Sequence, residues 1–351
     1  MRSYSVTAFG GAIEPMERAT PEPQGTEALV RVSHCGVCHT DVHIWKGYFD
    51  LGGGNRLEMG ARGIDLPMTL GHEAYGEIVA VGPEGDQSQI GRRGVVFPWI
   101  GCGACAACAA GDENLCMTPR FLGIFRPGGY GDHVMVPSAR YVVEMPGVDP
   151  ALAATYACSG LTAMGALEKA RPFGPGKPLV LIGAGGVGLA AVALLTAEGV
   201  TDYAVVDIDD GRLAAARSLG APVTVNANAP DAAAQLTADG PVQAVIDFVG
   251  AEQTTGFGIP LLRKGGAYIV VGLYGGAMTV PIPTLPLQAR RIEGAYVGNL
   301  ATLEKLAALV KTGRVPPIPV EERPWAACAH TLTQLERGAV TGRVVLDLSR
   351  A

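Results

Sequence analysis

The sequence has 351 residues, of which 48% are hydrophobic and 17% are charged, and its formal net charge is −6. This composition is typical of a globular chain with room for two domains, and it excludes an intrinsically disordered one. The acidic balance and the lack of a Lys/Arg run argue against nucleic acid as a partner.

The first predicted elements, in residues 1 to about 154, are short strands between Gly- and Pro-rich turns. Alternating apolar patterns occur in EALVRVSHCGV (27–37), GEIVAVGP (76–83) and YGDHVMVPSARYVVEMP (130–146). Such runs bounded by turn residues indicate strands. We expect a β-rich, barrel-like domain here.

The stretch HCGVCHTDVHIW, from His34 to Trp45, concentrates residues that bind metals or move protons. A catalytic zinc needs three protein ligands and one open position. Eight cysteines and six histidines are spread over the chain, so spacing alone does not identify the three ligands.

A second group of cysteines crowds into one short segment. Cys102, Cys105, Cys108 and Cys116 could supply four thiolates to a tetrahedral zinc with no open position, which would be a structural site. An iron–sulfur cluster is the alternative, although the spacing differs from the ferredoxin patterns. Clustered cysteines behind an N-terminus without a signal-peptide pattern favour metal over disulfides and predict a reducing, cytoplasmic location.

The sequence pattern changes near Leu179, from short strands between turns to apolar strands that alternate with helices. The apolar run from Pro178 to Gly199 is long enough to span a bilayer, but a glycine cluster divides it, so we interpret it as a strand followed by a helix and expect no membrane association. Further apolar strands are predicted in 203–209, 221–227, 242–250 and 267–275, with a helix in 211–221. Strands alternating with helices predict a doubly wound parallel sheet.

The glycine cluster fits a dinucleotide-binding turn. Gly183, Gly185 and Gly188 form G-x-G-x-x-G between a predicted strand and a predicted helix, with Gly186 and Val187 completing the turn. Asp207 ends the next strand, about 20 residues further on, where a carboxylate would accept hydrogen bonds from a ribose and repel a 2′-phosphate. NAD is therefore favoured over NADP, although the nearby Arg212, which could stack near the adenine, leaves some room for NADP. A glycine-rich turn without a ligand is the competing interpretation.

After residue 292 we expect a helix in ATLEKLAALVKTG (301–313) and a closing strand in GRVVLDLSR (342–350). This last segment is too small to fold alone, so it should pack back on the N-terminal domain.

In this order, CGVCHTDVH, GHEAYGEIVAVG, the four-cysteine loop, GAGGVG and YVGN resemble the zinc-dependent medium-chain alcohol dehydrogenases of the yeast and bacterial type. The resemblance runs nearly end to end. It implies an α/β protein in which a GroES-like β-rich catalytic domain (1–154 and 294–351) is interrupted by a Rossmann NAD-binding domain (155–293).

The resemblance also implies roles for individual residues. Cys38, His72 and Cys158 would bind the catalytic zinc, Asp41 would orient a zinc ligand, and Glu73 would be a nearby carboxylate able to approach the metal. Thr40 and His43 would relay the proton of the alcohol. The cofactor would contact His39, Phe248, Val249, Val271, Gly272, Leu273, Ala295, Tyr296, Val297 and Arg343, in addition to the glycine turn, Asp207 and Arg212.

The implied activity is reversible hydride transfer from a primary or secondary alcohol to NAD, with one catalytic and one structural Zn²⁺ per subunit. Trp45 and Trp99 could narrow the pocket, and an apolar or benzylic alcohol is the expected substrate. A polyol or amino-alcohol dehydrogenase and a catalytically silent NAD-binding module stay open as alternatives. The Gly-rich connection 47–66 departs from the yeast pattern, and the expected oligomer is a homotetramer, with a dimer as second choice.

Overall fold

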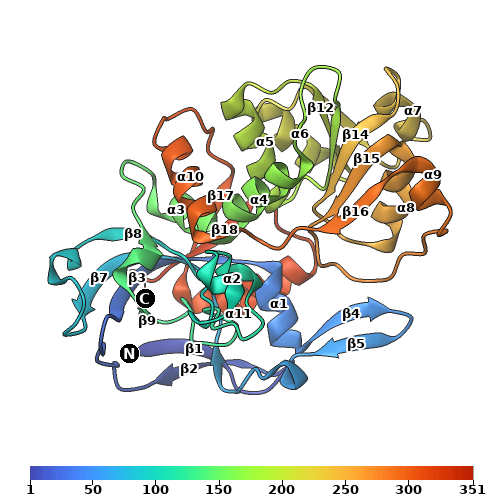
Figure 1. Ribbon diagram of the computed structural model, residues 1–351. Helices are drawn as coiled ribbons and strands as arrows, with labels where there is room; N and C mark the ends of the chain where they lie inside the picture. The colour runs from blue at the N-terminus through green and yellow to red at the C-terminus, as the bar shows by residue number, and fades with distance from the viewer. Residues whose placement is uncertain (351) are drawn as a thin grey trace.

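Two large sheets organise the protein, and the chain enters one, builds the other and then returns to the first. In the computed structural model, which describes residues 1–350, the N-terminal strands and the parallel sheet of β11 to β16 occupy separate halves (Figure 1). Both termini lie in the half that contains the N-terminal strands. The α/β fold class expected from the sequence is confirmed.

The N-terminal half contains a seven-stranded sheet in the order β10-β8-β7-β3-β18-β17, with β9 also paired to β3. The long central strand β3 pairs with β7 on one side and with β18 on the other, so the C-terminal segment packs back on the N-terminal half as expected. A three-stranded sheet, β2-β1-β6, lies beside it. The bounds are β1 (Arg2–Val6), β2 (Ile13–Glu17), β3 (Ala28–Val37), β6 (Met68–Thr69), β7 (Glu73–Val81), β8 (Arg93–Val96), β9 (His133–Val136), β10 (Val142–Val143), β17 (Val320–Pro324) and β18 (Arg343–Asp347).

The second sheet has six parallel strands in the order β13-β12-β11-β14-β15-β16. Counted along the chain this is 3-2-1-4-5-6, the doubly wound order whose strand order reverses beside its first strand. All four residues of β11 are buried, as expected for a central strand covered by helices on both faces. The bounds are β11 (Leu179–Ile182), β12 (Tyr203–Asp207), β13 (Val223–Asn226), β14 (Val242–Asp247), β15 (Leu262–Val270) and β16 (Arg291–Gly294).

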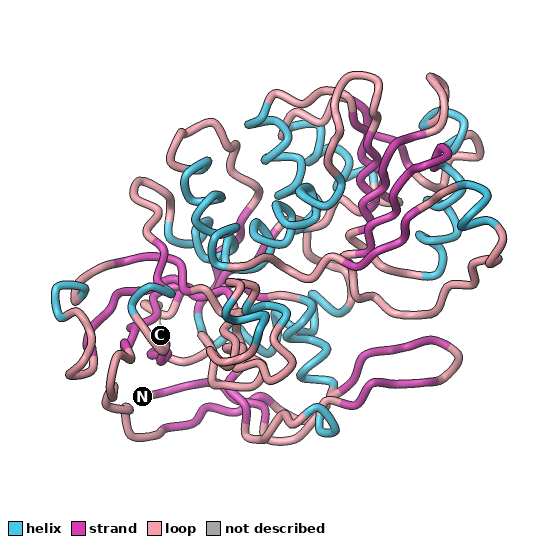
Figure 2. The backbone as a smooth tube through the Cα atoms, in the orientation of Figure 1, coloured by secondary structure: helices cyan, strands magenta, loops and turns pink. Residues whose placement is uncertain are grey.

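Helices lie along the parallel sheet and at the boundary between the two halves (Figure 2). The apolar run from Pro178 to Gly199 divides into β11 and α5, and no helix in residues 1–350 is long and apolar enough to cross a bilayer. The α-helices are α1 (His39–Lys46), α2 (Ala106–Ala109), α3 (Pro150–Thr155), α4 (Leu161–Ala170), α5 (Gly186–Glu198), α6 (Asp210–Ser218), α7 (Ala232–Leu236), α8 (Glu252–Leu261), α9 (Thr284–Gln288), α10 (Leu300–Val310) and α11 (Cys328–Glu336). A π-helical turn, η5 (Tyr156–Gly160), joins α3 to α4, and the 3₁₀ turns are η1 (Gly60–Arg62), η2 (Gln87–Gln89), η3 (Glu113–Leu115), η4 (Ala139–Tyr141) and η6 (Trp325–Ala327).

The Gly-rich connection 47–66 forms a hairpin of β4 (Tyr48–Gly52) and β5 (Asn55–Glu58). Figure 1 shows this hairpin extending from the N-terminal half below the parallel sheet. Its tip lies against the loop after β15, because a Cβ atom on Gly52 would come within 2.7 Å of the Ala277 nitrogen. The sequence analysis singled out this connection as a departure from the yeast pattern but did not identify the hairpin, which contacts the other half of the protein.

Candidate active site and metal centres

Three elements bring together the residues expected to bind a catalytic metal. Cys38 is the N-cap of α1, His72 immediately precedes β7, and Cys158 lies in the π-helical turn η5. Their ligand atoms and a Glu73 carboxylate oxygen all lie within 4.8 Å of one another, and all four residues are buried. Residues far apart in the sequence thus form one compact group of metal-binding atoms.

Asp41, in the first turn of α1, contacts two residues of this group through its carboxylate. Its Oδ1 lies 3.2 Å from His72 Nδ1, and its Oδ2 accepts hydrogen bonds from the Cys38 amide at 2.9 Å and the Tyr130 hydroxyl at 3.2 Å. Because Asp41 accepts a hydrogen bond from the Nδ1–H group of His72, the lone pair on Nε2 is available to bind a metal.

The side chains themselves fit a zinc ion. His72 Nε2 is buried and has no hydrogen-bond partner within the described chain. A hydrogen bond from Cys158 lowers the pKa of Cys38 well below its ordinary value, and burial opposes this change. One histidine and two thiols with an unpaired nitrogen are the donor set that zinc prefers in a catalytic site.

Glu73 and Arg343 form a buried ion pair beside this group. The Arg343 guanidinium donates to Glu73 Oε1, while Glu73 Oε2 has no partner among the described residues. Burial raises the pKa of Glu73 to about 7, and the Arg343 charge acts against that rise. Arg343 also lies under the glycine turn, since a Cβ on Gly186 would meet its Cδ at 2.3 Å. Its expected contact with a cofactor pyrophosphate stays a prediction.

Thr40 and His43 share one side of α1, three residues apart, and both are partly exposed. The His43 ring lies 4.5 Å from the Phe49 ring, which belongs to β4. Burial, and secondarily the neighbouring His39, lowers the pKa of His43. The structure therefore holds an imidazole that stays neutral to lower pH than a free one. His39, at the start of α1, is exposed.

Aromatic side chains form a wall next to the metal-binding group. The ring of Trp99 lies 5.4 Å from that of His72, 5.4 Å from that of Phe121 and 5.7 Å from that of Tyr296. Trp99 is also fixed by a hydrogen bond from its indole nitrogen to the Ala157 carbonyl at 3.0 Å. Trp45 has a different contact: its indole nitrogen donates a hydrogen bond to the Gly11 carbonyl at 2.7 Å.

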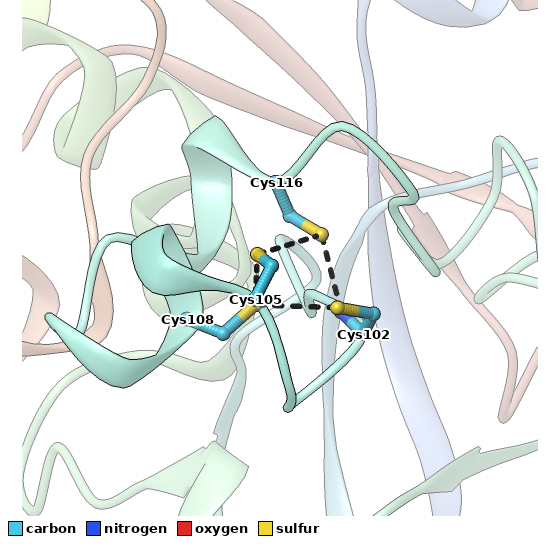
Figure 3. A group of neighbouring side chains, drawn as sticks. All are labelled: Cys102, Cys105, Cys108 and Cys116. Atoms are coloured by element: carbon cyan, nitrogen blue, oxygen red, sulfur yellow. Dashed lines mark hydrogen bonds between the residues drawn. The ribbon is translucent and has the colours of Figure 1, made fainter.

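The four clustered cysteines converge on one point (Figure 3). Sulfur–sulfur distances are 4.0 Å for Cys102 and Cys108, 3.5 Å for Cys105 and Cys108, and 3.7 Å for Cys105 and Cys116. A tetrahedral zinc with bonds of about 2.3 Å requires its sulfurs to be roughly 3.8 Å apart. All eight cysteines are free thiols, so this loop fits a closed zinc site and not a disulfide pair.

The glycine turn joins β11 to α5 as the sequence predicts. Gly183 has φ of +96°, and a Cβ on Gly188 would lie 1.9 Å from the Gly183 carbonyl oxygen, so the helix approaches the strand closely. Next to Gly185 nothing lies within 4 Å of a Cβ position. The open space faces the N-terminus of a thirteen-residue helix, which favours an anion such as a pyrophosphate.

Asp207 is the last residue of β12, with its side chain largely buried. Its Oδ2 accepts from the Ala184 amide in the glycine turn at 2.7 Å, and its Oδ1 accepts from the Asp209 amide at 3.0 Å. Arg212 lies 4.0 Å from this carboxylate and donates to the Gly338 carbonyl at 3.0 Å. Asp207 thus contacts the glycine turn directly, and Arg212 lies beside Asp207.

The remaining expected cofactor residues follow the carboxyl ends of β14, β15 and β16. The Phe248–Val249 and Val271–Leu273 segments pack together, because a Cβ on Gly272 would overlap the Val249 carbonyl. The Ala295 amide donates to the Val270 carbonyl at 2.9 Å, which brings Ala295, Tyr296 and Val297 to the same edge. Ligands of doubly wound sheets bind at this edge.

Other residues of the opening stretch have structural surroundings. Cys35 is buried against Gly71 and Gly129. His34 lies near Glu322 and Asp347, but the Asp347 carboxylate already accepts from Ser349 and pairs with Arg350 at 2.9 Å. The sequence analysis did not identify Tyr130 and Phe49, whose contacts with Asp41 and His43 arise only through the fold.

Comparisons with known proteins agree with this geometry. The family described as "Alcohol dehydrogenase GroES-like domain" matches residues 24–147, and the family described as "Zinc-binding dehydrogenase" matches residues 186–312. NAD-dependent alcohol dehydrogenases from Saccharolobus solfataricus and Sulfurisphaera tokodaii are 34% and 33% identical to this protein, each over 99% of both chains. The crystal structure of the alcohol dehydrogenase from Aeropyrum pernix covers 99% of this chain and 100% of its own, with a TM-score of 0.88 and 29% identity.

Proposed function

The chain belongs to the zinc-binding, GroES-like alcohol dehydrogenases, and from that premise we propose that it oxidises apolar primary or secondary alcohols, including benzylic ones, with NAD. The observation that carries the proposal is the buried Cys38–His72–Cys158 group next to the aromatic wall of Trp99, Phe121 and Tyr296. An aromatic wall of this kind favours an apolar side chain on the alcohol carbon.

The metal groups divide into two tasks. Cys38, His72 and Cys158 would hold a zinc ion that supplies Lewis-acid chemistry at the alcohol oxygen when bound. Cys102, Cys105, Cys108 and Cys116 would hold a second zinc ion that orders their loop. Asp41 keeps the His72 ring in the tautomer that presents Nε2.

The proton of the alcohol would leave along α1. The Thr40 hydroxyl would accept it and pass a proton on, and His43 would take the proton onward to solvent as a neutral imidazole. The packing of Phe49 on His43 supports this role, because partial burial keeps the imidazole in its proton-accepting form. The other half of the oxidation is hydride transfer to the nicotinamide, which is the chemistry that NAD supplies when bound.

Asp207 supports NAD over NADP as the cofactor. Its carboxylate ends β12 next to the glycine turn, where it would bond to a ribose and repel a 2′-phosphate. Arg212 contacts the Gly338 carbonyl, and this contact competes with binding to a phosphate. Relatives named as NAD-dependent alcohol dehydrogenases support this hypothesis and do not favour the polyol alternative.

The test is NADH formation from NAD over a panel of aliphatic, benzylic and polyol alcohols, with and without a zinc chelator. We expect chelator-sensitive activity that is greatest with an apolar or benzylic alcohol. A preference for polyols would contradict the substrate proposal. No reduction with any alcohol, in protein shown to contain zinc, would favour the silent NAD-binding module.

We also propose a homotetramer, with a dimer as the second choice. β16 is an edge strand of the parallel sheet, and the segment before it exposes large apolar side chains at Tyr274, Ile282 and Leu287. Exposed edges and apolar patches of this kind favour association with another copy. Light scattering after size-exclusion chromatography measures the assembly, and a monomer would contradict the proposal.

A cytoplasmic location is a further part of the proposal. Eight free cysteines, four of which converge in a metal-binding loop, require a reducing environment to stay unoxidised. Fractionation of cells that produce the native protein tests it, and recovery outside the cytoplasm would contradict it.

A further inference from the structure

The four-cysteine loop contacts the edge of the cofactor region through two side chains. Asn114, in the 3₁₀ turn η3, donates from Nδ2 to the Tyr296 carbonyl at 3.0 Å. Asp112, just before that turn, accepts at Oδ1 from the Asn299 side chain at 2.9 Å. Both residues lie between Cys108 and Cys116, so they belong to the loop that the cysteines organise.

The segment that they hold has an unusual backbone. Val297 has φ of +46°, and a β-branched residue rarely adopts this left-handed conformation because its side chain crowds the backbone. Such a conformation persists only where the surroundings impose it. The Val297 carbonyl is also packed against α4, because a Cβ on Gly165 would lie 2.3 Å from its oxygen.

The far end of the segment is equally fixed. Asn299, which donates to Asp112, caps α10 by accepting from the Thr302 amide at 2.9 Å. One side chain therefore joins the cysteine loop to the start of a helix. The segment 295–299 is held by the cysteine loop, α4, α10 and the end of β15.

This segment borders both the expected cofactor edge and the aromatic wall of the candidate active site. Ala295 pairs with Val270 at the end of β15, and the ring of Tyr296 belongs to the aromatic wall with Trp99 and Phe121. A shift of Tyr296 and Val297 would therefore change the cofactor edge and the substrate wall together.

We propose that Asp112 and Asn114 are positioning residues, through which the four-cysteine loop holds Tyr296 and Val297 in the geometry that NAD binding requires. The loop then does more than stabilise its own fold, because its order sets the conformation of a strained segment in the cofactor site. The inference rests on the proposed cofactor role of residues 295–297.

The experiment compares four variants of the full-length protein. Asn114→Ala and Asp112→Ala each remove one contact to the segment, and Asp112→Asn keeps an oxygen that can accept from Asn299. Arg140→Ala is the matched control, because Arg140 supports the same loop through Glu113 at 2.7 Å and has no hydrogen bond to residues 295–299. For each we would measure zinc content, the NADH dissociation constant by fluorescence, and KM for NAD with kcat.

We expect Asn114→Ala and Asp112→Ala to raise the NADH dissociation constant and KM for NAD roughly five- to tenfold. Each variant loses one hydrogen bond, and the strained backbone at Val297 is then free to relax away from the geometry that binds NADH. The fall in kcat should be smaller, and zinc content should equal that of the unsubstituted protein. Asp112→Asn and Arg140→Ala should stay within about twofold of it.

NADH affinity unchanged in both alanine variants would overturn the proposal, and so would an equal loss in Arg140→Ala. If an alanine variant loses zinc, Asp112→Asn decides: a zinc-loaded Asp112→Asn protein that binds NADH as weakly as Asp112→Ala contradicts positioning by this contact. NADH binding is measured without any alcohol, so this result is separate from failure of the proposed oxidation.

Discussion

Asp41 shows at the scale of one residue how a buried carboxylate connects residues that could bind a metal. It accepts from the Cys38 amide, the Tyr130 hydroxyl and His72 Nδ1, and so links two candidate metal-binding residues through its two oxygens. The carboxylate is fully buried, and these donors satisfy both of its oxygens. Its loss should disturb the metal before it disturbs the fold.

Asp41→Asn should therefore weaken zinc binding at the catalytic group by about 10- to 100-fold, since an amide cannot serve His72 as a carboxylate does. The measurement is zinc retained per chain during dialysis against a graded chelator, with NADH formation followed in parallel. Tyr130→Phe removes only one donor and serves as the control. Equal zinc retention in Asp41→Asn and the unsubstituted protein would disprove the orienting role.

Asp207→Asn should raise the NADH dissociation constant about tenfold, because a hydrogen bond to a charged acceptor is replaced by one to a neutral amide. The amide oxygen can still accept from Ala184, so the glycine turn should keep its shape. Discrimination against NADPH should also weaken, since the repulsion of a 2′-phosphate disappears. Binding titrations with both cofactors check this, and an unchanged NADH/NADPH ratio would refute Asp207 as the ribose acceptor.

His43 makes a pH prediction possible. Burial under Phe49 contributes to a lowered pKa, so the neutral, proton-accepting imidazole survives to lower pH. Phe49→Ala exposes the ring, the pKa of His43 rises toward its ordinary value, and protonation begins at higher pH. The acid limb of kcat/KM for alcohol oxidation should then move to higher pH, whereas Phe49→Leu should leave it near its original position. A limb that does not move in Phe49→Ala argues against His43 as the base.

At the scale of elements, the turn between β11 and α5 separates two uses of glycine. Gly188 permits helix and strand to approach, because a Cβ there would lie 1.9 Å from the Gly183 oxygen. No protein atom lies within 4 Å of a Cβ position on Gly185, and we expect the pyrophosphate to bind in this space. We therefore predict that Gly188 serves the packing of the helix and Gly185 serves the ligand.

Gly188→Ala should destabilise the protein by about 1–3 kcal/mol, the cost of forcing packed elements apart, and should also weaken NADH binding. Gly185→Ala should leave the thermal midpoint nearly unchanged and yet weaken NADH binding at least as much. Thermal unfolding and NADH titration of the two variants make the comparison. If Gly185→Ala proves as unstable as Gly188→Ala, the division of roles is wrong.

At the scale of the whole molecule, the chain leaves its first sheet after β10 and returns to it with β17 and β18. β18 lies inside that sheet, between β3 and β17, so the first half is completed only after the parallel sheet has been made. The four-cysteine loop precedes β10, whereas the candidate catalytic group combines Cys38 and His72 with Cys158, which lies in η5 after β10. A metal in each group should contribute differently to stability.

Cys116→Ser should remove the loop metal and lower the thermal midpoint by on the order of 10 °C, because metal-binding energy orders this loop. Cys38→Ser should cut NADH formation at least about 100-fold through loss of catalytic zinc, with a much smaller change in midpoint. Zinc analysis, calorimetry and an alcohol oxidation assay measure the contrast. Full activity in a well-folded Cys38→Ser protein would contradict the assignment of Cys38.

Local patterns were sufficient for part of this protein. Two of the candidate sites each lie within one continuous stretch of sequence, namely the four cysteines and the glycine turn with Asp207. Their spacing along the chain is therefore enough to predict which side chains lie close together. Apolar strands alternating with helices likewise predicted the parallel sheet, and β11, α5, β12 and β14 lie where their patterns indicated. The catalytic group was different: spacing could not select Cys38, His72 and Cys158, and only the family resemblance named them.

Tertiary structure alone decided which distant side chains touch. The hairpin β4–β5, the packing of Phe49 on His43 and the bond from Tyr130 to Asp41 have no signal in the local sequence, because each joins elements that are separated along the chain. The same holds for Asn114, which reaches Tyr296 across nearly two hundred residues. Sequence periodicity determines which face of an element is buried, but the partner of that face depends on how the sheets are ordered and packed, and only the folded chain sets that order.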